Sequence, residues 1–420
     1  MSEDVFKPLS YLLELVNDRT SGSKDSEKPY VGLEHIPSMG SSLTAVGAAN
    51  DSISINSLFT EGDILFGKLR PRLRKSVRVA ISGYCSTDVL VLRPTANVDP
   101  VFAGFVAQSD TVFSAAIRTE EGTKMPRGSW RDIKTVNVFL PSDKKAQRKI
   151  AAILTTIDTA IEKTEALIAK YQQIKAGLMH DLFTRGVLPN GQLRPPRDQA
   201  PELYQESAIG WIPRDWRLER CVELCSRICV GIVIQPTQYY VTDGVPAFRS
   251  ANVREVGIDP SDLVYISPYA NAVLAKSQIK TGDILSVRTG YPGTSAVVPP
   301  EFNGANCIDI LISSPNSTVR SEYLCDWINS TFGKEQVLRQ QGGMAQQHFN
   351  VGEMRELLVA LPQPAEQCQI TNRSDSIRII LRVEAERLQK LRQQKLGLMQ
   401  DLLTGKVPVP VDAPETAPRP

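Results

Sequence analysis

Residues 173–187, QIKAGLMHDLFTRGV, decide the fold, because they return 220 positions later as residues 393–407, QQKLGLMQDLLTGKV. A second anchor, GDIL at 62–65, returns as GDIL at 282–285, again 220 positions apart. Between these anchors Leu-Pro at 140–141 matches Leu-Pro at 361–362, with a shift of 221. Two distant anchors that keep nearly the same spacing indicate an internal duplication. The identical pairs in the first match are Gln173 and Gln393, Lys175 and Lys395, Gly177 and Gly397, Leu178 and Leu398, Met179 and Met399, Asp181 and Asp401, Leu182 and Leu402, Thr184 and Thr404, and Val187 and Val407.

Each copy has a strand-rich part followed by a long helix. The runs DVLVLRP at 88–94 and IDILISSP at 308–315 are rich in β-branched residues and end in proline, which predicts short strands. The helical parts carry no proline from 142 to 184 or from 365 to 404. Apolar residues recur there by sevens, which favours coiled-coil packing. The positions are Ile150, Ile157, Tyr171 and Leu178, with Thr164 polar, and Ile370, Ile377, Leu391 and Leu398, with Glu384 polar.

We therefore expect an α+β fold with a pseudo-two-fold duplicated plan. Two mixed α/β domains, at 1–142 and 206–363, are separated by two long antiparallel helices, at 143–186 and 364–405, that form a coiled coil. A linker at 187–205 is dense in proline and polar residues, and a proline-rich tail at 406–420 is expected to be disordered. The other interpretation, that each helix packs only on its own domain, fits poorly because ordinary globular helices have about 8–20 residues.

Composition excludes several classes of protein. The 48 Lys and Arg against 46 Asp and Glu leave a net charge of +2, so global charge indicates no partner. No apolar run approaches the length of a membrane span. The start, MSEDVFKPLS, lacks the apolar core of a signal peptide. With 7 cysteines, an odd number, reduced thiols and a cytoplasmic location are expected.

The sequence predicts no catalytic residue and no metal site. It contains no phosphate-binding loop, zinc-protease motif or nucleophile elbow. The 3 histidines lie in dissimilar segments. Cys221, Cys225 and Cys229 are spaced by four, which would align them on one helix face, but buried structural thiols explain them better than a metal does.

The strongest local signal is the basic segment KLRPRLRKSVR at 68–78, which contains no acidic residue. On a strand its alternation would place the basic side chains on one face, where they suit phosphate oxygens and guanine edges. Lys68 also matches Arg288 in the second copy. DNA contact is therefore predicted, with a solvated basic face as the alternative. The predicted contacts here are Lys68, Arg70, Arg72, Arg74 and Lys75.

The second copy has SVRTGYPGT at 286–294 in the same place, which makes Arg288, Thr289 and Tyr291 candidates for DNA contact. Two glycine-led loops, GTKMPRGSW at 122–130 and GGMAQQHF at 342–349, precede each Leu-Pro and have the character of recognition loops. In the first loop Lys124 and Arg127 are suited to guanine or phosphate. In the second loop Gln346 and Gln347 are suited to bidentate contact with adenine.

In these motifs the chain resembles the specificity subunits of type I restriction–modification enzymes. The resemblance rests on YVGLEHI at 30–36, EGDILFGKLRP at 61–71, IGWIPRDW at 209–216 and the twin helix ends, and with the duplicated layout it covers nearly the whole chain. One departure is FRSANV at 248–253, where the first copy has VGLEHI.

The resemblance implies a non-catalytic subunit of a cytoplasmic, type I site-specific DNA adenine methyltransferase and deoxyribonuclease complex. The two strand-rich domains would be target-recognition domains, each reading one half of a split, asymmetric sequence in double-stranded DNA. The helices would hold the halves apart and dock two methyltransferase subunits and, in a full complex, motor/nuclease subunits. S-adenosylmethionine and ATP would bind the partners, and this chain would bind no cofactor. The alternative is a coiled-coil scaffold that joins two protein-binding domains without reading DNA.

Overall fold

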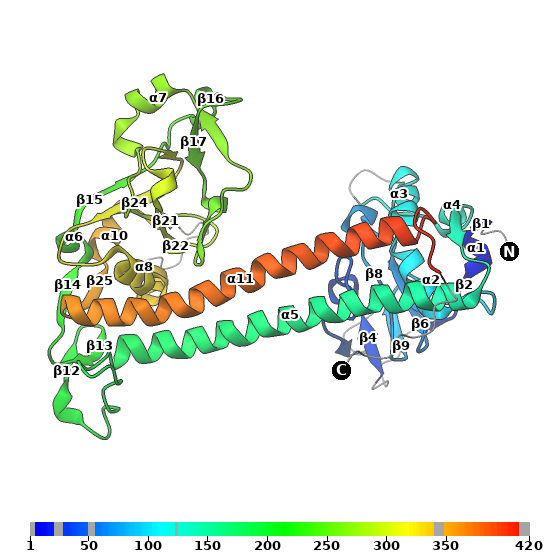
Figure 1. The fold of residues 1–420 in the computed structure, drawn as a ribbon, viewed down its shortest axis with the longest axis horizontal. Coiled ribbons are helices and arrows are strands. Elements are labelled where there is room, and N and C mark those ends of the chain that lie inside the picture. Colours follow the sequence, from blue (N-terminus) through cyan, green and yellow to red (C-terminus); the bar gives the residue numbers. More distant parts are fainter. Residues whose placement is uncertain (1–4, 21–27, 49–54, 122–124, 340–347, 411–420) are drawn as a thin grey trace. The chain divides into compact units, whose positions relative to one another are not determined.

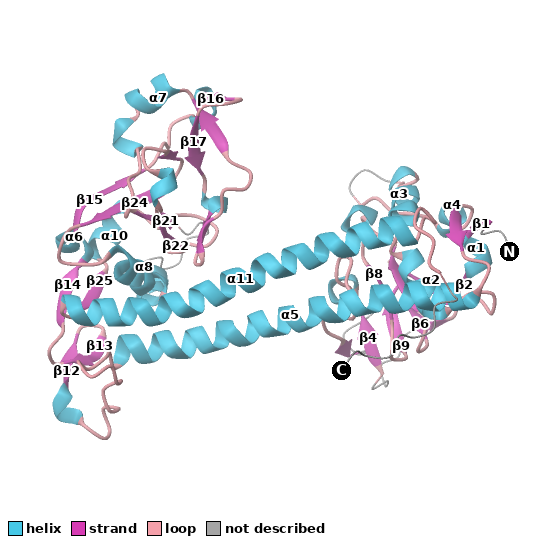
Figure 2. Ribbon diagram, viewed as in Figure 1, coloured by secondary structure: helices cyan, strands magenta, loops and turns pink. Residues whose placement is uncertain are grey.

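The computed structural model describes residues 5–20, 28–48, 55–121, 125–339 and 348–410 of a mixed α/β chain (Figures 1 and 2). The chain forms two compact units, which we name unit 1 (residues 1–166 and 386–420) and unit 2 (residues 167–385). Helices α5 (Lys144–Thr184) and α11 (Pro364–Leu402) each contribute to both units. The two long helices that the sequence predicts are therefore present. None of the described helices is long and apolar enough to span a bilayer.

Unit 1 is built on a four-stranded antiparallel sheet of order β2-β10-β7-β8, a five-stranded sheet of order β3-β6-β9-β4-β5, and the ribbon of β1 with β11. Its strands are β1 (Val5–Pro8), β2 (Leu13–Val16), β3 (Arg19–Thr20), β4 (Pro29–Val31), β5 (Gly47–Ala48), β6 (Asn56–Phe59), β7 (Ile64–Gly67), β8 (Ser76–Arg78), β9 (Gly83–Ser86), β10 (Val89–Pro94) and β11 (Asn137–Leu140). Its short helices and 3-10 turns are α1 (Leu9–Leu12), η1 (Leu33–His35), η3 (Pro71–Leu73), α2 (Pro100–Ala107), α3 (Asp110–Arg118) and α4 (Trp130–Ile133).

Unit 2 has a four-stranded sheet of order β15-β24-β21-β22, a second sheet of order β16-β20-β17-β23, and three two-stranded ribbons. Its strands are β12 (Tyr204–Ser207), β13 (Gly210–Pro213), β14 (Arg217–Arg220), β15 (Cys225–Val230), β16 (Tyr240–Val241), β17 (Val245–Phe248), β18 (Val253–Arg254), β19 (Gly257–Ile258), β20 (Val264–Ile266), β21 (Ile284–Val287), β22 (Ser295–Val297), β23 (Asn306–Cys307), β24 (Ile310–Pro315) and β25 (Leu358–Leu361). Its helices and turns are η4 (Pro201–Leu203), α6 (Cys221–Leu224), η5 (Pro236–Tyr239), η6 (Ser250–Asn252), α7 (Pro268–Val273), η7 (Ala275–Ser277), η8 (Pro300–Phe302), α8 (Ser321–Asn329), α9 (Thr331–Arg339) and α10 (Val351–Glu356).

The four-stranded sheets of the two units have equivalent strand orders and registers. In unit 1 Leu65 of β7 pairs with Val91 of β10, and in unit 2 Leu285 of β21 pairs with Ile312 of β24. All four side chains are buried, so each sheet places an apolar layer in its core. The strands predicted at 88–94 and 308–315 are confirmed as β10 and β24.

The two long helices also begin alike. The side-chain amide of Gln147 in α5 donates to the carbonyl of Pro141 at 2.8 Å, and that of Gln367 in α11 donates to Pro362 at 3.0 Å. In each case the amide oxygen accepts the backbone N–H of the residue before α2 or α8. Both glutamines are buried, so these bonds fix the start of each helix against its neighbouring short helix.

The structure aligns FRSANV with VGLEHI. β4 leads into η1 and pairs in parallel with β9, and β17 leads into η6 and pairs in parallel with β23. In each 3-10 turn the last side chain accepts a backbone N–H from three residues earlier: Nδ1 of His35 from Gly32 at 3.1 Å, and Oδ1 of Asn252 from Arg249 at 2.9 Å. The sequences differ, but both supply the acceptor that this turn needs.

The three cysteines spaced by four do not share a helix face. Cys221 lies in α6, whereas Cys225 and Cys229 lie in β15, because the helix has only four residues. All three thiols are buried, as the structural interpretation predicts, and burial raises the pKa of Cys229. Among the described residues, no group of three or more His, Cys, Asp or Glu is placed to hold a metal ion.

The predicted linker at 187–205 includes an ordered, buried contact within unit 2. Arg194 is 4% exposed and pairs with Glu366 at the start of α11. Glu366 also accepts the indole N–H of Trp216 at 3.0 Å and the backbone N–H of Val187 at 2.7 Å. Trp216 belongs to the IGWIPRDW motif, so this motif is hydrogen-bonded to the first turn of α11.

Candidate nucleic-acid interface

Only the last three residues of the basic segment of unit 1 form a strand, β8 (Ser76–Arg78), so the single basic face that a strand over the whole segment would give is not present. β7 ends at Gly67, and the chain then makes the turn η3 (Pro71–Leu73). Arg70 and Arg74 flank this turn with φ of 51° and 50°, in the left-handed region. Pro71 cannot donate to a neighbouring strand, and it starts the turn instead. The basic side chains therefore leave the segment in several directions rather than from one face.

Two of these side chains are anchored inside the unit. Arg74 forms an ion pair with Asp110, and its guanidinium lies 5.3 Å from the centre of the Phe113 ring. Lys75 donates to the carbonyl of Leu33 at 2.6 Å. Both side chains stabilise the fold in this position, and their contact with DNA stays a prediction.

Among the predicted contacts of the segment, Arg70 and Arg72 are the exposed ones. Within the described part of the chain Arg70 makes no ion pair, and Arg72 pairs at 2.9 Å with Glu120 while its side chain is 71% exposed. The carboxylate that holds Arg72 is half-buried, since the side chain of Glu120 is 18% exposed, so a phosphate would have to share or replace that partner.

The structure brings the basic segment and the first glycine-led loop together. Leu69 and Arg127 form a β-bridge. The backbone N–H of Arg70 donates to Pro126 at 2.7 Å, and that of Gly128 donates to Lys68 at 2.9 Å. The guanidinium of Arg127 pairs with Asp88 at 2.9 Å. Sequence reasoning selected both segments and did not predict that they touch.

Behind this contact lies a basic groove of about 530 Å³. Burial lowers the pKa of Lys68 in its wall, and Asp88 opposes that effect. Arg131 and Lys134 add two cations that sequence reasoning missed, although their spacing of three near α4 was a usable signal. The groove is lined by Leu15, Lys68, Leu90, Glu121, Arg127, Gly128, Ser129, Trp130, Arg131 and Lys134. Four cations and an indole against one carboxylate suit a phosphate-bearing ligand with a stacking surface.

Unit 2 repeats the arrangement after β21. Arg288 occupies the position of Lys68, forms an ion pair with Asp309, and donates through Nε to the carbonyl of Phe349 at 3.3 Å. The N–H of Phe349 returns a bond to Arg288 at 2.9 Å. The second glycine-led loop thus ends against Arg288, as the first loop lies against Lys68.

The tip that follows Arg288 is exposed and contains two glycines with positive φ. Gly290 has φ of 86° and Gly293 has φ of 82°, a conformation that side chains other than glycine rarely adopt. Tyr291 between them is 81% exposed, and Thr289 is half-buried. The turn therefore presents an aromatic ring, where unit 1 presents guanidinium groups.

Three predicted contacts, Lys124, Gln346 and Gln347, lie outside the described residues. The remaining predicted contacts are brought to two places, one in each unit.

Comparison with known proteins finds no matching family model. Over 316 residues the chain is 24% identical to the type I restriction enzyme MjaVIII specificity subunit of Methanocaldococcus jannaschii; this covers 69% of the chain and 66% of that protein, just under two thirds of its length. It is 22% identical over 427 residues to a candidate MjaX specificity subunit of the same organism, which covers 96% of the chain and 93% of that protein. Over 252 residues it is 23% identical to the EcoBI specificity subunit of Escherichia coli, which covers 57% of the chain and 52% of that protein.

Solved structures show the same fold. The S subunit of a type I restriction–modification system from M. genitalium matches with a TM-score of 0.58 and 13% identity, covering 96% of each chain. A chain from a study of complex assembly in the type I system matches with a TM-score of 0.53 and 18% identity, covering 97% of this chain and 99% of that one. The resemblance found in the sequence motifs is confirmed.

Proposed function

We propose that this chain is the DNA-specificity subunit of a type I restriction–modification complex and reads a bipartite, asymmetric DNA target. The observation that carries the proposal is that two equivalent strands, β7 and β21, lead into different exposed segments. The first presents Arg70 and Arg72, and the second presents Tyr291. One scaffold with two different surfaces suits the reading of two different half-sequences.

In this proposal residues 1–142 and 206–363 are the two target-recognition domains. The helices at 143–186 and 364–405 separate them as an antiparallel coiled coil in a pseudo-two-fold arrangement. Within unit 1 the ion pairs of Lys395 with Asp158 and of Arg392 with Glu165 support antiparallel packing, because the residue numbers rise along one helix as they fall along the other.

The proposed partners are double-stranded DNA, two methyltransferase subunits and, in a full complex, motor/nuclease subunits. Exposed apolar side chains on the long helices support a protein partner, since such side chains mark contact surfaces when they gather. They are Ile174, Ile379, Val383 and Leu396, which are 44–53% exposed. S-adenosylmethionine and ATP are assigned to the partners, so this chain is non-catalytic by itself. Its 7 free cysteines support a cytoplasmic location.

Modified-base sequencing tests this function. A host without adenine methylation would express the methyltransferase subunit encoded beside this chain, with and without the chain itself. We expect methyladenine at one split motif with a fixed gap, only when the chain is present. An active, soluble partner that gives no motif with this chain would leave the scaffold interpretation in its place.

A further inference from the structure

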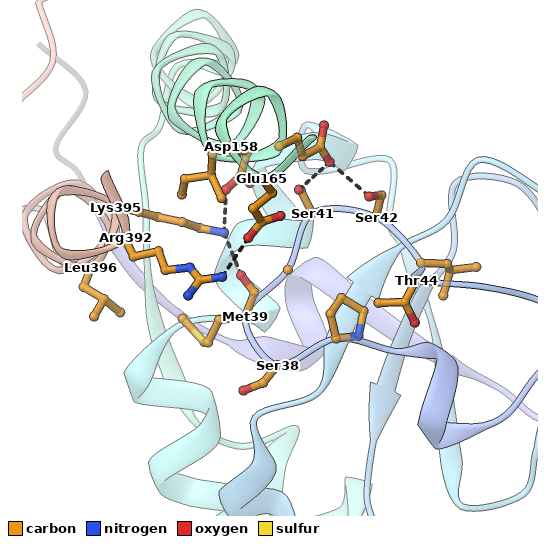
Figure 3. Close-up of a pocket in the computed structure, with 15 residues that line it drawn as sticks. Ser38, Met39, Ser41, Ser42, Thr44, Asp158, Glu165, Arg392, Lys395 and Leu396 are labelled. Carbon is orange, nitrogen blue, oxygen red and sulfur yellow. Dashed lines mark hydrogen bonds and ion pairs between the residues drawn. The ribbon is translucent and has the colours of Figure 1, made fainter. Parts of the chain in front are cut away.

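In unit 1 the loop at residues 37–44 is held by parts of both long helices. Figure 3 shows Lys395 of α11 reaching Asp158 of α5 and the loop at the same time. Its Nζ lies 2.6 Å from Oδ1 of Asp158 and donates to the carbonyl of Met39 at 2.9 Å. The hydroxyls of Ser41 and Ser42 donate to Glu162 of α5, at 2.7 and 3.0 Å. The loop therefore links the parts of both helices in unit 1 to the domain that contains the loop.

The same loop is bonded directly to the basic segment. The N–H of Met39 donates to the carbonyl of Arg74 at 3.2 Å, and Ser38 forms a β-bridge with Lys75. The buried side chain of Gln108 donates to the carbonyl of Gly40 at 2.9 Å. The same residue, Met39, thus accepts from Lys395 and donates to the segment that carries Arg70 and Arg72.

The ion pair at the centre of this arrangement is buried. Lys395 is 4% exposed and Asp158 is 5% exposed. Burial raises the pKa of Asp158, and Lys395 opposes that effect. A buried pair adds little net stability over an apolar pair of similar size, but it is satisfied in only one arrangement of its neighbours. One turn away, the exposed pair of Arg392 with Glu165 has no such requirement.

Unit 2 places the matching lysine against the corresponding loop, where its partner is a carboxylate of the loop instead of one on a helix. Lys175 precedes Lys395 by 220 positions, and its Nζ lies 3.5 Å from Glu255, in the loop after η6. This loop is closed as its counterpart is: Thr44 donates its N–H to the last residue of η1, and Asp259 donates to the last residue of η6. Glu255 also forms an ion pair with Lys334, so it keeps a cationic partner when Lys175 is removed. Among the described residues Asp158 has no second ion pair of this kind.

We propose that Lys395 and Lys175 are positioning residues that hold each recognition segment in one orientation on the helices of its own unit. This inference rests on the proposed function. Its consequence is discrimination between gap lengths in the DNA target. One extra base pair moves a half-site by about 3.4 Å and turns it by about 35°, which a rigidly held segment cannot follow.

The test uses a plasmid library in which the two half-sites flank the native gap or gaps that are one base pair longer or shorter, methylated in cells by the complete complex. Lys395→Met combined with Asp158→Leu replaces the ion pair with apolar side chains, which keeps the unit folded. We expect methylation of the altered gaps, relative to the native gap, to rise by about tenfold. Lys175→Met should raise it less, because Glu255 keeps Lys334.

Two controls separate positioning from folding. Arg392→Gln removes the exposed neighbouring pair and should leave the gap preference unchanged, and Lys395→Arg keeps the charge and should retain most of it. Folded Lys395→Met/Asp158→Leu protein with the gap preference of the wild type would overturn the inference while leaving the proposed function intact. A wild-type complex that methylates no split motif would overturn both.

Discussion

The segments that follow β7 and β21 occupy equivalent positions in the two units but differ in sequence and conformation. Each segment follows a buried strand, and a buried aspartate directly precedes that strand, Asp63 in unit 1 and Asp283 in unit 2. The first segment continues as a proline-containing turn with anchored and exposed cations, and the second as a glycine turn with an exposed tyrosine. A strand scaffold can therefore stay constant while the chemistry at its end changes.

The difference also predicts that the two segments contribute binding free energies with different salt dependence. Cations that meet phosphates contribute binding free energy that falls with salt, because they release counterions. An aromatic ring that packs against bases or sugars contributes free energy with little dependence on salt. If the proposed function is correct, the two segments should be distinguishable by salt titration of single variants.

The largest effect should come from removing the exposed cations of the first segment. Arg70→Ala combined with Arg72→Ala should weaken binding of the complex to its specific DNA by roughly 10- to 100-fold, and should lower the slope of log affinity against log salt by about 2. Fluorescence anisotropy across a salt series measures both. Lys406→Ala, at an exposed lysine near the end of α11, is the matched control. Unchanged affinity at moderate salt would return the segment to a solvated surface.

Sequence reasoning could select this segment but could not give its shape. The duplication, both long helices and the strands β10 and β24 follow from periodicity and composition, which are local properties of the chain. A strand face over residues 68–75 is absent because Pro71 and two left-handed arginines override the alternation of Arg and Leu, and only Ser76–Arg78 are a strand. The spacing of Arg131 and Lys134 was a local signal, but their meeting with Lys68 and Arg127 in one groove depends on a tertiary contact.

A smaller and different effect is expected at the second segment. Tyr291→Ala should weaken binding by roughly tenfold while leaving the salt slope unchanged, because it removes a ring and no charge. Tyr291→Phe keeps the ring and should bind nearly as the wild type does. Tyr269→Ala is the matched control, since Tyr269 is 80% exposed in the same unit and lies outside the predicted contacts. A change in salt slope on Tyr291→Ala would remove the contrast between the segments.

The smallest effect concerns the position in these two segments where both copies carry a cation. Lys68 has a lowered pKa because it is partly buried, whereas its counterpart in the second copy is an arginine, Arg288. In the free protein Lys68 loses its proton at a lower pH than an ordinary lysine does, and a nearby phosphate favours the charged form. Binding then takes up a proton, so affinity should fall as pH rises above the lowered pKa of Lys68.

The lowered pKa of Lys68 affects the free energy of unfolding in the opposite direction. The unfolded chain binds more protons than the folded chain between the lowered pKa and the ordinary value of 10.5, so the stability that Lys68 contributes rises with pH in that window. Lys68→Arg should therefore flatten the fall in DNA affinity that the wild type shows as pH rises towards 10.5, by a few-fold at the upper end, without improving thermal stability. Arg288→Lys, measured in parallel, should introduce the fall in the other half. If both variants show the wild-type dependence of DNA affinity on pH, Lys68 and Arg288 do not contact phosphate. The two segments then differ only in the residues around these two cations.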